Sequence, residues 1–486
     1  MTNGGFTKMD REKVTERSRG AAAGAAGGDR LLKDRKFTLW ALAWPVFIEL
    51  LLQFLLGAAD TLMVSTISDD AVAVVGFSSQ LFQALMTLFI TVSSGAGILI
   101  AQRLGAGEEG EARSIAIMAF TVSSAIGLAL SIVLYAFPLQ LASALQLPPE
   151  LGPLAAPYIS IVGAGMAFSA ATIALGTVIR STGNTRGPMY VAIGMNVLHV
   201  AMNYAFIYGA FGFPAWGLTG VAVSTTLSRA LAVIVLFVMF ANAFEQRIRW
   251  RELGTFHRRL FGEVMKIGWP LGANAASWFV SQLLIFSFIA MIGAKELAAR
   301  TYLNTMESFC FMLGYSVALA LQIQVAHLYG AGAMREAYRS AYRALGIGLA
   351  LVAANTLLLV AVGERALGLF TDDPEIIAMG VGLIGLNLLL QPAKMTNMAL
   401  GNALNAVGDT RFIMYTSLLS LTLVATVGSY WFGVRLGWGL TAIYLCMIAD
   451  ELVRGVWSLF RWKGRKRLRL AERQAAIADG TRAIGG

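Results

Sequence analysis

The sequence is poor in charge, in cysteine and in histidine. Only 14% of its 486 residues are Asp, Glu, Lys or Arg, against about a quarter in an ordinary soluble domain. Two cysteines, Cys310 and Cys446, lie inside apolar runs, and the three histidines are far apart in the chain. These scarcities argue against a disulfide framework, a Cys/His metal site and a soluble globular enzyme.

Hydrophobic residues are abundant instead, at 57% of the chain, and the mean hydropathy is +0.66. Runs of about 20 apolar residues match a hydrocarbon core roughly 30 Å thick, and the alternating period of a membrane β-barrel is absent. We therefore predict an all-α integral membrane protein. Its twelve predicted spans are 39–67, 71–102, 113–136, 155–179, 187–209, 216–242, 264–293, 296–328, 340–363, 376–403, 411–433 and 438–460.

The positive charge is placed unevenly. Of the 38 Lys and Arg, 31 fall in the tails and in alternate connections, and only four, among them Arg300, fall in the other connections. The positive-inside rule then puts both termini in the cytoplasm of a multi-pass inner (plasma) membrane protein. This explains the net charge of +10 better than a nucleic-acid partner does. The first 36 residues are expected to form a flexible basic tail without a cleavable signal peptide.

The chain is duplicated. WPVFIELLLQ from Trp44 is echoed by WPLGANAASW from Trp269, and RSTGNTRGPMY from Arg180 by NAVGDTRFIMY from Asn405, both at an offset of 225 residues. WGLTG at Trp216 and WGLTA at Trp438 differ by 222. Six spans per copy is an even number, so the repeats are parallel and related by a pseudo-two-fold axis along the membrane normal, as in transporters that rock one lobe against the other.

This duplication divides the chain into five predicted segments. They are a basic tail (1–36), an N-terminal six-helix lobe (37–242), a cytoplasmic linker (243–263), a C-terminal six-helix lobe (264–461) and a second basic cytoplasmic tail (462–486).

Several stretches resemble the multidrug and toxic compound extrusion (MATE) family. They are ADTLMVSTISDDAVAVVGFSSQ, QRLGAGEEGEAR, its echo HLYGAGAMREA, and the pair STGNTR and AVGDTR. The resemblance covers about residues 39–461 and is closer to DinF-like, H⁺-coupled members than to NorM-type members. It implies two six-helix lobes, an outward-open V-shaped cleft, and export of amphipathic, often cationic compounds in exchange for H⁺ or Na⁺.

Asp60 is the charge that most needs an explanation. It lies about 21 residues into the first span, roughly 32 Å along a helix, in the outer half of the membrane. Glu49, Gln53, Gly57 and Asp60 follow one another at i, i+4, i+8 and i+11, on one helical face. Such a polar stripe should face the lobe interior or a wet cavity. Removal from water favours the neutral acid, which makes Asp60 a candidate proton carrier; the alternative is a structural Asp satisfied by neutral donors.

The second copy lacks these acids. The residue 225 positions after Asp60 is Ile285, and the equivalent of Glu49 is Asn274. If the acids served only the fold, both copies might be expected to keep them. By the resemblance, an acid at this place binds the coupling cation.

The fifth span supplies candidate partners for Asp60. Asn196, His199 and Asn203 lie there, and Thr225 lies in the sixth span. Some relatives resemble this chain but have Asn and Asp where it has His199 and Asn203. The lost carboxylate weakens a Na⁺ site, whereas an imidazole suits protonation. The alternative is that His199 is a satisfied core residue.

The second lobe has its own polar candidates: Glu307, Lys394, Asn274 and Gln282. NorM-type members have two acids where this chain has Trp278 and Lys394, so a second-lobe Na⁺ site is not expected. Lys394 needs a partner, and Glu307 is the expected one. The open alternatives are a structural ion pair, a role in substrate or proton handling, and snorkelling of Lys394.

Arg454 follows Asp450 and Glu451 at i+4 and i+3. It can therefore reach either acid on one helix, and a pairing of buried charges is predicted.

Together these features predict a secondary antiporter that exports amphipathic, cationic organic compounds in exchange for H⁺, with Na⁺ left open. The alternative is a flippase of related architecture for lipid-linked precursors or polysaccharides. A membrane-embedded enzyme is disfavoured because no catalytic triad or metal cluster is visible. No cofactor beyond the coupling ion, no bound metal and no nucleic acid are expected, and the chain is expected to act as a monomer in the lipid bilayer.

Overall fold

The computed structural model describes residues 37–144 and 147–482. Within these ranges every regular element is a helix, which confirms the predicted all-α fold. The predicted tail 1–36 lies outside the described residues.

Up to residue 252, the described residues form eight α-helices and three short 3₁₀ turns. In chain order they are α2 (Leu39–Ser65), α3 (Asp69–Gly105), α4 (Glu109–Ala136), α5 (Pro138–Ala144), η2 (Pro149–Leu151), α6 (Gly152–Ala164), α7 (Met166–Ser181), α8 (Arg186–Tyr208), η3 (Ala210–Gly212), α9 (Leu218–Ala241) and η4 (Trp250–Glu252).

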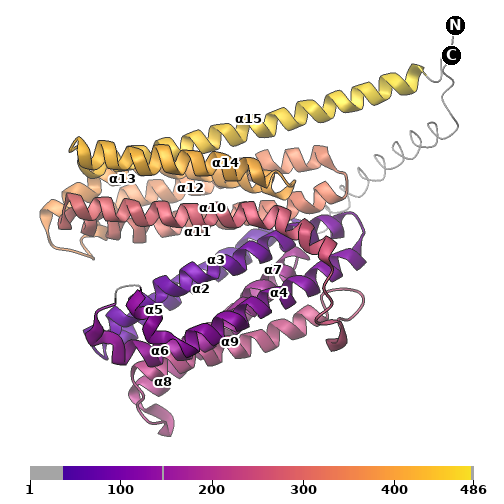
Figure 1. Cartoon of the computed structure of the whole chain (residues 1–486). Coiled ribbons are helices and arrows are strands. Elements are labelled where there is room, and N and C mark those ends of the chain that lie inside the picture. The colour runs from indigo at the N-terminus through magenta and orange to yellow at the C-terminus, as the bar shows by residue number, and fades with distance from the viewer. Residues whose placement is uncertain (1–36, 145–146, 483–486) are drawn as a thin grey trace. The chain divides into compact units, whose positions relative to one another are not determined.

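From residue 258 to 482 the structure has five helices of more than 30 residues, the shorter α14, and two π-helical segments of seven residues each. They are α10 (Arg258–Ile292), α11 (Ala294–Gly330), α12 (Met334–Leu367), α13 (Pro374–Ala406), α14 (Thr410–Ser420), η5 (Leu421–Val427), η6 (Ser429–Arg435) and α15 (Gly439–Arg482). The long helix at the yellow end of the colour scale in Figure 1 is α15.

Most predicted spans correspond to one helix that is long and apolar enough to cross a membrane. Ten helices of the described chain meet this description, and the bent pair formed by η2–α6 and α7 makes eleven. The twelfth predicted span, 438–460, lies in α15, where Asp450, Glu451 and Arg454 interrupt the apolar run.

The fourth span is broken where α6 meets α7, and its two parts are bent by 41°. Glycine at position 165 stands at the break, and a Cβ there would lie 2.9 Å from Thr226. The backbone groups near the break find side-chain partners: Ser131 accepts from the Ala167 amide at 2.9 Å, and Thr226 donates to the Ile161 carbonyl at 3.1 Å. This replacement is what makes a broken helix tolerable at membrane depth.

The chain divides into two compact units, each with its own apolar core. Among the described residues, one unit contains 41–101 and 108–280, and the other contains 37–40, 102–107 and 281–482. Phe82, Val162 and Met166 belong to the core of the first of these units, and Ile285 and Leu383 to the core of the second. The division falls within α10, at Ser281.

Two backbone contacts, one at Gly105 and one at Gly330, are equivalent under the internal repeat. A Cβ on Gly105 would lie 2.1 Å from the carbonyl oxygen of His327, and a Cβ on Gly330 would lie 1.9 Å from that of Gln102. Both pairs are related by the 225-residue offset, so the contact is reciprocal, as a two-fold relation requires. No side chain can be added at either glycine without separating the two backbones.

Outside the membrane-spanning segments, Asp373 caps the N-terminus of α13. Its side chain accepts from the backbone amides of Glu375 at 2.9 Å and Ile376 at 3.4 Å, and Lys295 lies 3.2 Å away. The hydrogen bond from the Glu375 amide, reinforced by Lys295, holds the pKa of Asp373 below its ordinary value. The cap satisfies donors that the first turn of a helix leaves unpaired.

Close packing of α4 on α7 gives a test of this fold. A Cβ on Gly127 would lie 2.6 Å from the Ala170 Cβ and 3.0 Å from the Ala167 Cα, and neither atom can rotate away. We expect Gly127→Val to destabilise the protein by about 1–3 kcal/mol through overpacking, visible as a lower Tm in detergent. Gly110→Ala, on the same helix and with no atom within 4 Å of the added Cβ, is the control and should leave Tm nearly unchanged.

Candidate functional site

The structure brings Asp60 of α2 together with two residues of α8. The Asp60 Oδ1 lies 2.9 Å from the His199 Nε2 and accepts from the Asn203 Nδ2 at 2.8 Å. His199 and Asn203 are buried, whereas the Asp60 side chain keeps 26% of its exposure. The i, i+4 spacing of the two α8 residues lets both reach one carboxylate oxygen. Asp60 is therefore held by neighbours yet remains open to exchange with its surroundings.

The amide of Asn203 is oriented from α9. The Ser224 hydroxyl donates to the Asn203 Oδ1 and also lies 3.0 Å from the Val221 carbonyl oxygen. With Ser224 on its oxygen, Asn203 presents its NH₂ group to Asp60, as an ionised carboxylate requires. If the amide rotated by half a turn, its oxygen could instead accept from a protonated Asp60 while Ser224 turned to Val221. The same residues can thus satisfy both protonation states of Asp60.

The second ring nitrogen of His199, Nδ1, links Asp60 to α9. The His199 Nδ1 lies 3.2 Å from the Ser228 Oγ, and the Ser228 hydroxyl donates to the Thr225 carbonyl at 3.1 Å. Thr225, a predicted coupling residue, therefore contributes its backbone oxygen, while its own hydroxyl donates to Val221 at 2.8 Å.

The His199 ring can act as a donor or as an acceptor in this cluster. Its Nδ1 lies beside the Ser228 hydroxyl, and its Nε2 lies 2.9 Å from the Asp60 Oδ1 and 3.0 Å from the Asn203 Nδ2. Nε2 can therefore donate to an ionised Asp60, or accept from Asn203 or from a protonated Asp60. Gain or loss of a proton at this pair changes which of these hydrogen bonds form.

The hydrogen bonds of this cluster join α2, α8 and α9 of one unit. In the same unit, Tyr158 of α6 is buried, and the half-buried Arg229 of α9 donates to the Ser169 Oγ at 2.8 Å.

The other two polar residues of the α2 stripe lie elsewhere. Glu49 pairs with Arg180 of α7 at 2.9 and 3.1 Å, and Gln53 is exposed. The structure does not bring Glu49 or Gln53 to the Asp60 carboxylate. Glu49 has its own counter-charge because its position on α2 lies beside Arg180 in the last turn of α7.

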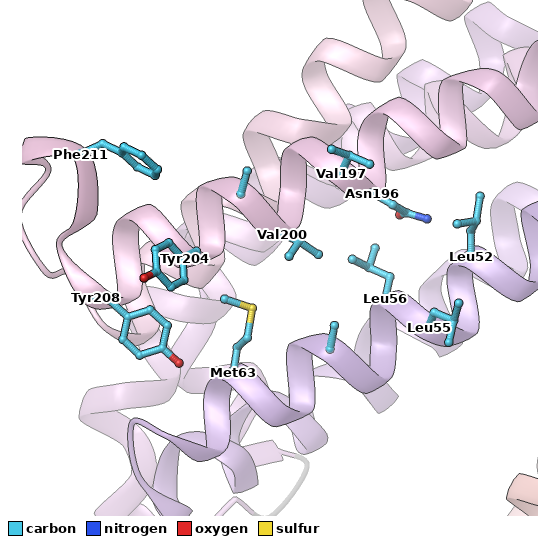
Figure 2. A pocket seen from close by; sticks show the side chains of 12 residues that line it. Leu52, Leu55, Leu56, Met63, Asn196, Val197, Val200, Tyr204, Tyr208 and Phe211 are labelled. Carbon is cyan, nitrogen blue, oxygen red and sulfur yellow. The ribbon is translucent and has the colours of Figure 1, made fainter.

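Asn196, the third predicted residue of the fifth span, lines a pocket between α2 and α8. The pocket has a volume of about 1080 Å³ and is lined mainly by apolar side chains, with Tyr204 and Tyr208 among them. Figure 2 shows Asn196 projecting from α8 towards Leu52 and Leu56 of α2. Only 7% of Asn196 is exposed, and neither its Nδ2 nor its Oδ1 has a hydrogen-bond partner in the described chain.

In the other unit, Glu307 of α11 is the centre of a second polar network, and its predicted pairing with Lys394 is wrong. Its ion-pair partner is Arg300, at 3.0 Å, in a setting where both side chains are almost wholly buried. Asn387 and Tyr444 each donate to the Glu307 Oε1 at 3.0 Å. The charge count places Arg300 in a connection although the predicted span 296–328 contains it; in the structure it lies in α11 (Ala294–Gly330), two turns before Glu307 and on the same face.

The position of Lys394 along α13 keeps it out of contact with Glu307. Asn387 is the α13 residue that reaches Glu307, and Lys394 follows it by seven residues, about 10 Å along the helix. Lys394 is half-buried and acts on Glu307 only as a nearby charge. Asn274 and Gln282, both on α10, are half-buried, and no hydrogen bond within the described residues joins either to Glu307.

The predicted pairing of Asp450, Glu451 and Arg454 is confirmed. The Arg454 guanidinium contacts Asp450 and lies 3.0 Å from Glu451. Ser420 and Asn397 add hydrogen bonds to the two acids at 2.7 and 2.8 Å. These three charges of α15 are thus satisfied inside the protein.

Sequence reasoning missed several partners in these networks. Ser224 and Ser228 could have been found from their i, i+4 spacing beside Thr225 in the sixth span. The predicted fourth span, 155–179, ends before Arg180, whereas α7 extends to Ser181. Tyr444 and Asn387 had no such signal, because nothing in their spacing points to Glu307. Across the described residues, no group of three or more His, Cys, Asp or Glu side chains could hold a metal ion.

Comparison with known proteins agrees with this architecture. The MatE family model matches residues 45–205 and 270–431. The chain is 33% identical to the uncharacterized transporter YisQ of Bacillus subtilis, over 89% of this chain and 95% of that protein. It is 26% identical to a probable multidrug resistance protein NorM of Thermotoga maritima, over 87% and 92%.

Solved structures share the fold at low identity. A MOP superfamily transporter from Pyrococcus furiosus superposes with a TM-score of 0.81 at 18% identity, covering 90% of this chain and 97% of that one. The outward-facing structure of a multidrug resistance MATE family transporter of the MOP superfamily gives the same TM-score and identity, covering 90% and 98%.

The buried Glu307 network allows a stability test. Arg300→Met leaves the Glu307 charge buried without its ion-pair partner, so we expect a loss of about 3–5 kcal/mol, read as a lower Tm. Arg300→Met combined with Glu307→Leu removes both charges and should recover part of the loss. The control is Lys295→Met on the same helix, whose ion pairs are exposed and worth about 0–1 kcal/mol. Equal effects of the two single variants would contradict a buried ion pair at Arg300.

Proposed function

The chain belongs to the multidrug and toxic compound extrusion (MatE) family of transporters, which are not enzymes, and we propose on that basis that it is a secondary antiporter for multidrug efflux. Its cargo is small amphipathic organic compounds, cationic ones among them, and its coupling ion is H⁺. Relatives named as multidrug resistance proteins, among them PmpM of Pseudomonas aeruginosa, support the cargo class.

The observation on which H⁺ coupling rests is the contact of Asp60 with His199 and Asn203. The cluster can bind a proton at an acid or at an imidazole, and its hydroxyls and amide can rearrange when the proton leaves. Coupling requires that the ion bind two conformations with different affinity. Protonation at Asp60 changes which bonds join α2 to α8 and, through Ser228, α8 to α9, so it favours one arrangement of these helices over another.

The surroundings of Asp60 favour a proton over Na⁺. Hard cations bind to several oxygen ligands, whereas Asp60 Oδ1 faces the His199 nitrogen and the Asn203 NH₂ group. These groups donate hydrogen bonds to a carboxylate but cannot ligate a cation while they do so. A Na⁺ ion would need Asn203 reversed and the imidazole turned away.

The topology of the proposed transporter follows from its charge distribution. With 31 of the 38 Lys and Arg on one side, both termini lie in the cytoplasm and the protein resides in the inner membrane. Asp60 then lies in the outer half, reached by protons from outside. A monomer suffices, because the whole cluster around Asp60 comes from one unit of one chain.

Asp60→Asn tests the coupling role. Asparagine keeps the size and polarity of the side chain but cannot bind and release a proton, so we expect a folded protein that no longer exports a cationic dye from proteoliposomes under an imposed pH gradient. The measurement is the initial rate of dye efflux, with Tm as the folding check.

Asp69→Asn serves as the matched control, since Asp69 is an exposed acid in the first turn of the neighbouring helix α3. It should export at the wild-type rate. Full retained export by the Asp60→Asn protein would remove Asp60 from the coupling mechanism.

A second test distinguishes H⁺ from Na⁺ as the coupling ion. In proteoliposomes of the wild-type protein, a pH gradient without a Na⁺ gradient should drive export, and a Na⁺ gradient at equal pH should not exceed the rate seen with no gradient. The Asp60→Asn protein defines the background in each case. Export driven by Na⁺ alone would replace H⁺ with Na⁺ as the coupling ion.

A further inference from the structure

A groove lies between α14 and α15 in the second lobe. It has a volume of about 380 Å³ and is lined mainly by apolar and aromatic side chains. Three of its lining residues, Tyr415, Leu419 and Phe460, are each more than half exposed. An exposed apolar groove on a membrane protein is a surface that lipid can enter. The full lining is Phe412, Tyr415, Thr416, Leu419, Trp457, Phe460 and Arg461.

The first lobe forms a groove at the equivalent place, between α8 and α9. Its volume is about 360 Å³, and six of the seven residues that line the α14–α15 groove have a repeat equivalent in its lining. Because both copies form a groove, the residues that differ between the copies show what is particular to the second. At the offset of 225 the pairs are Gly187 and Phe412, Tyr190 and Tyr415, Val191 and Thr416, and Gly194 and Leu419; at the offset of 222 they are Val235 and Trp457, and Met239 and Arg461.

Charge distinguishes the two linings. Among the described residues that line the α8–α9 groove there is no Asp, Glu, Lys or Arg, whereas Arg461 lines the α14–α15 groove in place of Met239. The Arg461 Nε donates to the Asp409 Oδ2 at 2.8 Å, and its Nη2 donates to Oδ1 at 3.4 Å. The guanidinium lies 5.1 Å from the centre of the Phe412 ring. The second copy therefore holds a cation at one end of an apolar groove.

Arg461 has hydrogen-bond donors left for a ligand. A guanidinium carries five N–H groups, and the contacts with Asp409 use two of them. The Arg461 side chain remains 45% exposed, so its other donors are open to a ligand in the groove. Guanidinium donors bind phosphate oxygens in a two-bond geometry, and phosphate is the anion that a phospholipid headgroup carries.

The position of Arg461 along its helix matches the depth of a headgroup. Arg461 directly follows the predicted twelfth span, 438–460, and Phe412 lies at the beginning of the eleventh, 411–433. From Phe412 to Leu419 the groove follows α14 for about 10 Å into the span. A phosphate on Arg461 and an acyl chain beside Tyr415 and Leu419 would therefore be in the order in which a lipid presents them.

We propose that the α14–α15 groove binds a phospholipid with an anionic headgroup, such as phosphatidylglycerol, whose phosphate contacts Arg461 and whose acyl chain lies along the aromatic lining. A zwitterionic lipid has the same phosphate but also an ammonium group, which weakens its attraction to a guanidinium. The α8–α9 groove can hold an acyl chain but has no cation in its described lining to select the headgroup. Such binding uses neither Asp60 nor an ion gradient, so it is independent of the proposed transport function.

The test is photolabelling of the purified protein in phosphatidylcholine nanodiscs without a gradient. Two probes with the same diazirine-bearing acyl chain, one a phosphatidylglycerol and the other a phosphatidylcholine, are each added at a low mole fraction, and labelled peptides are quantified by mass spectrometry. We expect the α14–α15 groove to take up about fivefold more phosphatidylglycerol than phosphatidylcholine. The α8–α9 groove is the internal control and should be labelled equally by both probes.

Variants assign the preference to Arg461. Asp409→Asn combined with Arg461→Met gives the second groove the first-lobe residues, Asn184 and Met239, without leaving Asp409 unpaired, and it should be labelled equally by both probes. Arg461→Gln repeats the loss of the cation if the double variant does not fold, with Tm as the folding check. Arg339→Met is the matched control, because Arg339 is an exposed base of α12 outside the groove lining, and it should keep the fivefold preference.

Three results would overturn the proposal. The first is equal labelling of the wild-type α14–α15 groove by the two probes. The second is a preference that survives in the Arg461 variants, since the general charge of exposed neighbours such as Arg411 and Lys463 would then explain it. The third is a loss of preference in Arg339→Met as large as in the Arg461 variants, which would assign the effect to the overall charge of the protein.

Discussion

The polar packing of the first lobe depends on one partly buried carboxylate, that of Asp60. Asp60 needs donors when it is ionised and an acceptor when it is protonated, and hydrocarbon supplies neither. The lobe meets this demand with an amide and an imidazole on α8, each backed by a serine of α9. Asn203, His199 and the two serines can each change hydrogen-bond partner. The cluster can therefore satisfy both the ionised and the protonated carboxylate, which is the physical basis for the proposed response to a proton.

The internal repeat shows that the polar networks are additions to the fold. Asp60 and Tyr158 correspond by the 225-residue offset to Ile285 and Leu383, which lie in the apolar core of the second lobe. Conversely, Glu307 corresponds to Phe82, in the apolar core of the first lobe. The same six-helix framework thus forms with a polar or an apolar residue at these places. Each lobe has a polar network at positions where the other lobe has apolar core side chains. The helices can therefore pack together without either network.

The sequence predicted the fold and the members of the Asp60 cluster better than it predicted partners across helices. Helical spacing placed His199 and Asn203 on one face, and the repeat singled out Asp60, because both are properties of position along the chain. It failed for Glu307, since Lys394 and Arg300 are equally plausible bases until the register of α13 and the start of α11 are known. It also failed for Glu49, where Arg180 proved to lie inside α7. An apolar run fixes a helix only to within a turn or two, and one turn is enough to exchange one partner for another.

The proton cluster and the pocket occupy neighbouring stripes of the same two helices. On α2, Ala59 and Met63 line the pocket while Asp60, between them in sequence, turns to α8. On α8, Asn196 lies in the pocket one turn from His199. In the antiport proposed above, a substrate held between α2 and α8 and a proton at Asp60 would act on the same helix spacing. If each favours a different spacing, binding of one weakens binding of the other by the same factor in both directions.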